Sequence, residues 1–248
     1  MTSSASPDAA AADGLFPDNS APGGRIAGMV FRPVATLETT MRDARWRRVL
    51  VLTTAAALAV GMVVMQTAIG QQALVDQWER TTAALGHAVD AAGYARLEAL
   101  SRYGALYSAV GTLLVGPGLA LIVTVLLQAA FGRTRAVPFV TAFAAVVHVG
   151  VILALRQVVV AVLAYARETT AGAVSLGAWF SGLDASSPLA RALGVVDFFV
   201  VWWLVLLGIA AAMLYGRRRR NLVCAFLGLY LLLALVTAAA LAVAGGTA

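Results

Sequence analysis

The sequence predicts an all-α integral membrane protein, a five-transmembrane-helix bundle with interfacial amphipathic helices. Of its 248 residues, 61% are hydrophobic and 12% are charged, whereas roughly a quarter of the residues in soluble domains are charged. Five nearly charge-free stretches are each long enough to cross the hydrocarbon core of a bilayer as a helix. This composition excludes a typical soluble enzyme and predicts one membrane domain without a folded soluble module.

Residues 1–25 are predicted to form a disordered cytoplasmic tail, followed by the membrane domain, residues 26–248. Ala, Ser, Asp, Pro and Gly dominate the tail, and such a composition buries too little apolar surface to become ordered. The tail also lacks the basic start and the apolar stretch of a secretory signal.

Residues 26–48 predict an amphipathic helix on the membrane surface. Pro33 stands where the first turn of a helix tolerates proline, and Val34, Leu37 and Met41 share one face. Trp46 is of a type enriched at the membrane interface. Four arginines nearby can contact anionic headgroups, for anchoring alone or for specific lipid recognition: Arg42, Arg45, Arg47 and Arg48.

The predicted spans are residues 49–69, 105–131, 137–165, 193–215 and 222–243. The shortest of them would be about 31 Å long as a helix, which is enough to cross the hydrocarbon core. The loop 70–103 shows the apolar spacing of one or two interfacial helices. The loop 166–192 is glycine-rich and predicted to be irregular, with Trp179 and Phe180 near the interface.

Arginine placement predicts a multi-pass protein of the cell membrane with a cytoplasmic amino end and an external carboxyl end. All 18 basic residues are arginine, which together with the high alanine content indicates a bacterial source with a GC-rich genome. Most of them lie before the first span, in the loop 132–136 or between the last two spans, and basic residues favour the cytoplasmic side. The clearest topology anchors form one run: Arg217, Arg218, Arg219 and Arg220.

Small residues recur along one face of the second span and predict close helix packing there: Gly104, Ser108, Gly111 and Gly118. The triplet Gly116-Pro117-Gly118 predicts a kink, because proline removes a backbone donor. Such a kink serves either helix packing or a transport path.

Arg156 and Asp197 are ionisable residues within predicted spans, where each costs about 2.5–3.5 kcal/mol at mid-helix. Counting residues along the two spans places both side chains in the outer leaflet. The sequence therefore predicts that they form a structural intramembrane pair. Proton or ion handling is the alternative, with His148, Gln128 and Gln157 as the further polar groups.

No catalytic residue, metal site or cofactor is predicted. His87, His148 and Cys224 cannot complete a four-ligand zinc site. The GxSxG, GxxxxGK[ST] and GxGxxG motifs are absent, so nucleophilic, nucleotide and dinucleotide chemistry lack their starting residues. Basic residues beside spans do not form a nucleic-acid patch, and no small-molecule substrate is indicated.

A cytoplasmic lead-in with Phe31 and Pro33 precedes Trp46 and the five spans, with a long helical segment after the first. The fourth span then contains GVVDFFVVW. From Val30 to about Val243 this order resembles the Yip family, named for interaction with Ypt/Rab GTPases, in its bacterial branch. Many bacterial members open the fourth span with Asp, an aromatic residue and Trp and carry a small residue later; the matching positions are Asp197, Phe199, Trp202 and Gly208.

The resemblance implies a five-helix bundle of the kind involved, in eukaryotes, in vesicle trafficking and membrane shaping through partner binding, without enzymatic activity. The tail has no GTPase-facing motif, and a bacterial relative lacks Rab partners. We therefore expect a scaffold or interaction protein in the lipid bilayer, with a membrane-protein partner or a second copy of itself. The alternative is a small transporter or channel component, which should have a continuous polar or small-residue cavity reaching the midplane. A scaffold should be closed by Leu, Val and aromatic side chains.

Overall fold

The computed structural model describes residues 21–84, 89–133, 135–167, 174, 193 and 196–245. Within them every regular element is a helix, and five helical segments are long and apolar enough to cross a membrane. This confirms the predicted fold class. The five segments are α4 (Arg47–Met65), α7 (Gly104–Phe131), α8 (Phe139–Val149) with α9 (Val151–Arg167), α11 (Phe198–Tyr215) and α12 (Arg219–Gly245).

Some sequence predictions concern parts of the chain outside the described residues. They are the disorder of residues 1–20, the role of His87, and most of the loop 166–192 with Trp179 and Phe180.

The third and fourth spans differ from their predicted bounds. The third consists of α8 and α9, which are separated at Gly150, and the Gly150 carbonyl accepts hydrogen bonds from the amides of Leu153 and Ala154. The fourth begins at Phe198 instead of residue 193, because the preceding Asp197 caps the helix.

The lead-in forms two helices, α2 (Pro22–Phe31) and α3 (Pro33–Arg42), instead of the single helix predicted over 26–48. The chain is already helical at Pro22, so the predicted end of the disordered tail at residue 25 is wrong. Both helices begin with proline, whose missing N–H is no loss in a first turn. An ion pair explains why the early residues are ordered: Arg25 is almost fully buried and its Nη2 lies 3.0 Å from Asp43 Oδ2.

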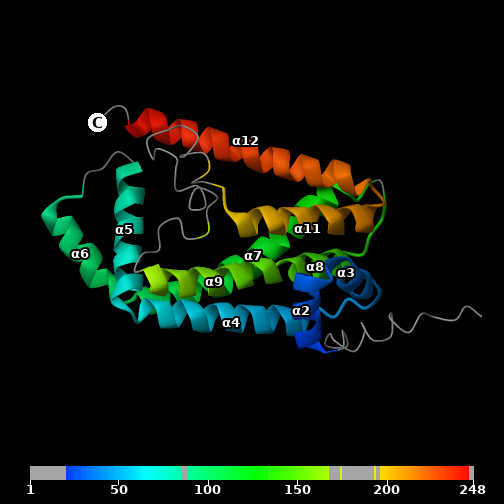
Figure 1. Cartoon of the computed structure of the whole chain (residues 1–248), viewed down its shortest axis with the longest axis horizontal. Coiled ribbons are helices and arrows are strands. Elements are labelled where there is room, and N and C mark those ends of the chain that lie inside the picture. The colour runs from blue at the N-terminus through cyan, green and yellow to red at the C-terminus, as the bar shows by residue number, and fades with distance from the viewer. Residues whose placement is uncertain are drawn as a thin grey trace, which may run out of the picture.

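The apolar face of the lead-in contacts protein, whereas the sequence predicted a helix on the membrane surface. Leu37 of α3 and Met29 of α2 are fully buried, and α3 packs against α8. Val34 and Met41, the other residues of the predicted face, are half-buried. Figure 1 shows both helices at one end of the bundle, lying across the spans.

The long loop after the first span forms two helices, as one of the predicted alternatives. They are α5 (Ala68–Ala84) and α6 (Ala91–Ser101), which pack against each other. Figure 1 shows α5 across the end of the bundle opposite α2 and α3, with α6 beyond it. The Asp90 side chain caps α6 by accepting a hydrogen bond from the Gly93 amide at 2.7 Å.

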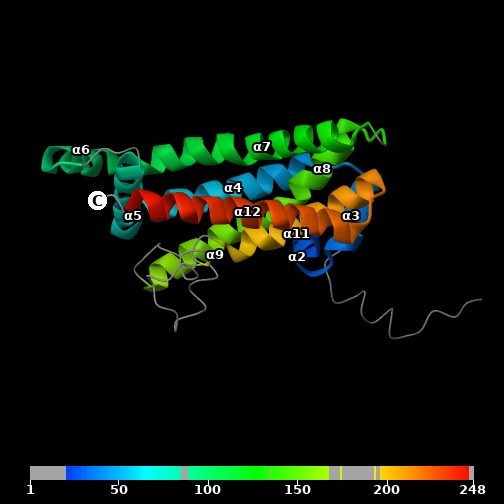
Figure 2. The same cartoon turned by 90° about the horizontal axis from the view of Figure 1, so that it is seen from above.

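The spans are not packed in a closed ring. Helix α4 contacts α7 and α9, α11 contacts α12, α8 and α9, and α7 also contacts α8. Figure 2 shows α7 along one side of the molecule and α9 on the other, while Figure 1 shows α12 at an edge beside α11. Helix α11 is the most buried span, and α7 and α12 are among the least buried.

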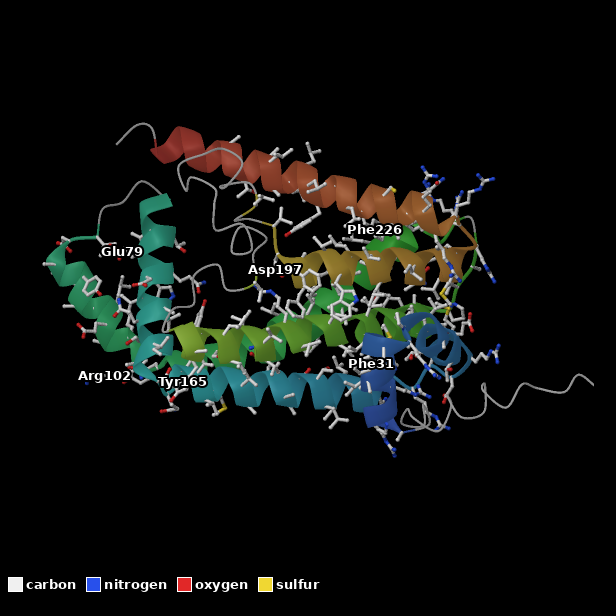
Figure 3. The ribbon with its side chains drawn as sticks, viewed as in Figure 1. Phe31, Glu79, Arg102, Tyr165, Asp197 and Phe226 are labelled. Atoms are coloured by element: carbon white, nitrogen blue, oxygen red, sulfur yellow. The ribbon has the colours of Figure 1, made fainter. Side chains whose placement is uncertain are left out.

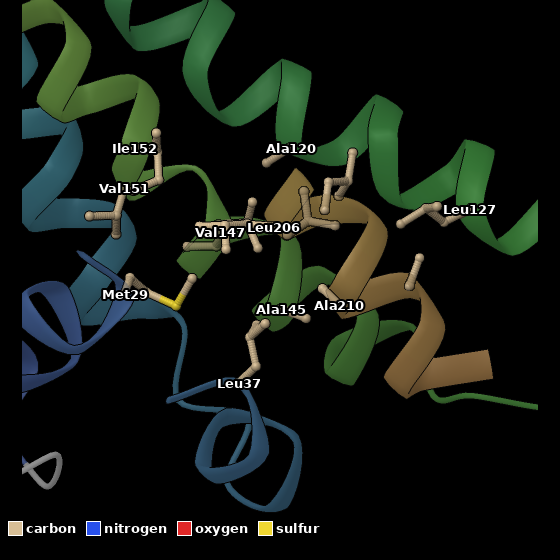
Figure 4. Close-up of a cluster of buried hydrophobic side chains, with 14 of the residues drawn as sticks. Met29, Leu37, Ala120, Leu127, Ala145, Val147, Val151, Ile152, Leu206 and Ala210 are labelled. Atoms are coloured by element: carbon tan, nitrogen blue, oxygen red, sulfur yellow. The ribbon is translucent and has the colours of Figure 1, made fainter. Parts of the chain in front are cut away.

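The core lies toward the end of the bundle that carries α2 and α3. In Figure 4, Met29 and Leu37 reach from the lead-in toward Ala145 and Val147 of α8, and Leu206 of α11 lies beyond them. All five side chains are 5% exposed or less. The lead-in helices thus complete the hydrophobic core of the membrane domain.

Candidate functional site

The structure brings Arg156 and Asp197 together, as predicted. Arg156 Nε of α9 donates to Asp197 Oδ2 at 2.6 Å across 41 positions of sequence. The carboxylate side chain is 14% exposed and the arginine side chain 39%. Asp197 lies between the facing helices in Figure 3. The pair therefore links α9 to the start of α11.

Asp197 also makes contacts that the sequence analysis missed. Its other carboxylate oxygen, Oδ1, accepts from the amides of Phe199 and Val200 at 2.8 and 3.2 Å, which caps α11. Its own backbone amide donates to the hydroxyl of Tyr230 in α12 at 3.1 Å. An Asp immediately before an apolar run is a recognisable capping signal, whereas the Tyr230 contact has no local signal. We call Arg156, Asp197 and Tyr230 the three-helix junction.

The other matched positions of the fourth span surround the start of α11 or its contact with α12. Phe199 is buried, and its ring lies 6.2 Å from that of Trp202. A Cβ at Gly208 would come within 2.9 Å of the Val223 backbone. Gly208 therefore allows α11 and α12 to pack closely, a role that the sequence analysis had not assigned to it.

The predicted small-residue face of α7 is only partly a packing surface. A Cβ at Gly104 would meet Leu74 and Met65 at 3.1 Å, and Ser108 faces Gly61 of α4 so closely that a Cβ at position 61 could not fit. A Cβ at Gly111 or Gly118 would meet nothing within 4 Å. The prediction of close packing is therefore wrong for these two glycines, because α7 extends past the surface that α4 covers.

A groove with a volume of about 400 Å³ lies between α4, α7 and the α8–α9 break. Thr53, Thr112 and Gln157 contribute polar groups to its lining, and Leu119 and Val147 contribute apolar ones. The Gln157 side chain also donates to the Ala57 carbonyl of α4 at 3.3 Å. The groove is therefore mixed in polarity and lies along the middle of α7.

His148 is fully buried in α8, where Nδ1 is 2.7 Å from the Ala144 carbonyl. Among the described residues, no side chain pairs with its Nε2 and no three His, Cys, Asp or Glu residues gather into a metal-binding group. The absence of a cofactor and of enzymatic activity stays a prediction.

The arginine-rich segments lie at one end of the bundle. Arg217–Arg220 are exposed after Gly216, which ends α11 in a left-handed conformation with φ 65°. A Cβ at Gly216 would lie 3.4 Å from Arg135 of the α7–α8 connection. Figure 3 shows nitrogen-tipped side chains at this end, where α2 and α3 also lie. The charge asymmetry read from the sequence is therefore also an asymmetry in space.

No protein-family model matches the chain, and comparisons with curated proteins and with solved structures found no significant match.

Proposed function

We propose that this polytopic membrane protein is a non-enzymatic scaffold or interaction protein of the Yip family's bacterial branch. It resides in the cell membrane with its amino end in the cytoplasm and binds another membrane protein or a second copy of itself. The order of the lead-in, the five spans and Asp197 at the start of the fourth span supports the family.

The observation that carries the scaffold role is the closed centre of the bundle. Ala145 and Val149 of α8 and Leu206 and Ala210 of α11 are each 3% exposed or less. Such aliphatic packing leaves no room for a hydrated path between these helices. The bundle is therefore built to hold its surfaces in place.

The surfaces it holds are the outer faces of α7 and α12. Leu114 of α7 is 67% exposed and Leu232 of α12 is 58% exposed, and each belongs to a run of exposed aliphatic residues. In a membrane these faces contact lipid or a neighbouring transmembrane helix, where side-chain packing drives association.

Site-specific photocrosslinking in native membranes tests this function. A photoreactive amino acid at Leu114 or Leu232 should give a protein adduct of one discrete mass, identified by mass spectrometry, because a bound partner occupies a fixed face. The matched control is Leu206, which is buried and should give none. Adducts with lipid alone at every exposed position of both helices would contradict the proposal.

The mixed groove between α4 and α7 favours the alternative, a small transporter or channel component, because transport paths use polar groups near helix breaks. A membrane-impermeant thiol reagent distinguishes the two functions in a Cys224→Ser background, since the native cysteine is exposed. Labelling of Thr112→Cys would indicate a hydrated groove and support transport. Protection of this position, together with a discrete adduct, would support the scaffold.

A further inference from the structure

A second cavity, of about 480 Å³, lies at the arginine-rich end of the bundle. It is formed by the start of α2, the connection between α3 and α4, the first turn of α4 and Val140 of α8. The residues that give it its chemical character are Arg25, Arg45, Trp46, Arg47 and Arg48. We call it the arginine pocket.

The arginine pocket carries excess positive charge. One carboxylate serves two of its guanidinium groups: Asp43 Oδ2 lies 3.0 Å from Arg25 Nη2 and 2.9 Å from Arg45 Nε. Residues 22–49 contain six arginines and two acidic residues, a formal charge of +4. Asp43 therefore arranges the wall of the pocket without neutralising it.

The first turn of α4 adds to this charge. Trp46 is the N-cap residue of α4, and no side chain caps the helix. The first amides of a helix have no carbonyl partner within it, and the helix dipole makes this end favourable for anions. Arg47 and Arg48 are exposed in this same turn, and guanidinium groups bind phosphate oxygens through paired N–H donors.

The position of the pocket favours a lipid over a soluble anion. The Trp46 ring packs edge-to-face on Phe143 of α8 at 4.9 Å, and the Arg47 guanidinium lies 5.8 Å from the Trp46 ring centre. Trp residues are enriched at headgroup depth. Below this level Val51 of α4 and Val140 of α8 are 65% and 52% exposed, which gives acyl chains an apolar surface next to the pocket.

We propose that the arginine pocket binds the phosphate of an anionic phospholipid in the leaflet at this end of the bundle. The headgroup phosphate lies against Arg47, Arg48 and the first turn of α4, and the acyl chains lie along α4 and α8. This site does not depend on the scaffold function.

Lipid titration of the purified full chain in detergent, followed by native mass spectrometry, tests the site. Phosphatidylglycerol should bind more tightly than phosphatidylcholine, and Arg47→Gln with Arg48→Gln should weaken phosphatidylglycerol binding roughly 25-fold, the factor expected for two charges at a membrane surface. Arg219→Gln with Arg220→Gln removes two charges at the same end but outside the pocket, and should change binding little. Equal weakening by both pairs would overturn the site, because it would show general electrostatic attraction.

Two further measurements keep the outcome decisive. Arg47→Lys with Arg48→Lys keeps the charge and should retain most of the binding, and thermal unfolding without lipid shows whether each variant is folded. Inorganic phosphate, titrated alone, should bind far more weakly than phosphatidylglycerol because it lacks acyl chains. If phosphate binds as tightly as the lipid, the pocket is a site for a soluble anion and the lipid proposal is wrong.

Discussion

The two carboxylate oxygens of Asp197 have separate tasks. Oδ2 pairs with Arg156 and requires a charge, whereas Oδ1 caps α11 and requires only an acceptor. The backbone amide of the same residue holds Tyr230 and requires neither. Substitutions that keep one task and remove another can therefore separate the contributions to stability.

Asp197→Ala should destabilise the protein more than Asp197→Asn. The alanine variant loses the cap, worth about 1 kcal/mol, and leaves Arg156 unpaired, which in buried pairs costs about 3–5 kcal/mol. The asparagine variant keeps an acceptor for the cap and loses only the charge. Detergent thermostability of both variants measures this difference.

A mutant cycle on the same pair tests whether the charges depend on each other. Adding Arg156→Leu to Asp197→Asn should recover stability relative to Asp197→Asn alone, because no unpaired charge remains in the membrane. Losses that simply add would mean that the ion pair contributes nothing and that Arg156 extends toward the surface.

Single-residue reasoning predicted part of the three-helix junction and not the rest. Counting residues along two helices gives their depths, so the meeting of Arg156 and Asp197 could be predicted. Tyr230 lies 33 positions after Asp197, and its contact depends on how α12 is rotated against α11. No local pattern in the sequence encodes that rotation.

At the scale of the element, glycine is informative only when its facing helix is known. Sequence spacing selected Gly111 and Gly118, yet neither would place a Cβ near another atom. Gly208 was named only for its resemblance, and it lies at the tightest contact of α11 with α12. The bounds of the spans followed from hydropathy, whereas their packing partners could not be predicted because each face is equally apolar.

Gly208→Ala should destabilise the protein, and Gly118→Ala should not. The new Cβ at 208 would lie 2.9 Å from the Val223 Cα, so the two helices must separate, and overpacking of this kind costs about 1–3 kcal/mol. At 118 the space is open and alanine has the higher helix propensity. Thermal unfolding in one detergent compares the variants, and equal effects would contradict close packing of α11 on α12.

For the whole molecule, five apolar segments and the asymmetry of arginine follow directly from composition. The two halves of the lead-in could not be predicted as core, since the same apolar face suits lipid or protein. In Figure 1 α2 and the carboxyl end lie at opposite ends, as an odd number of spans requires. Orientation then depends on which end carries more arginine.

Reporter fusions test this orientation. A reporter placed after Arg220 should be cytoplasmic and one at the carboxyl end external, because the exposed run Arg217–Arg220 is retained on the cytoplasmic side. Replacing these four arginines by glutamine should reduce the fraction of correctly oriented chains. Replacing Arg96 and Arg102 of α6, which lie at the other end of the bundle, should not reduce it, since this face gains nothing from positive charge. Reporters found on the same side at both positions would show that α12 does not cross the membrane, and the five-span topology would be wrong.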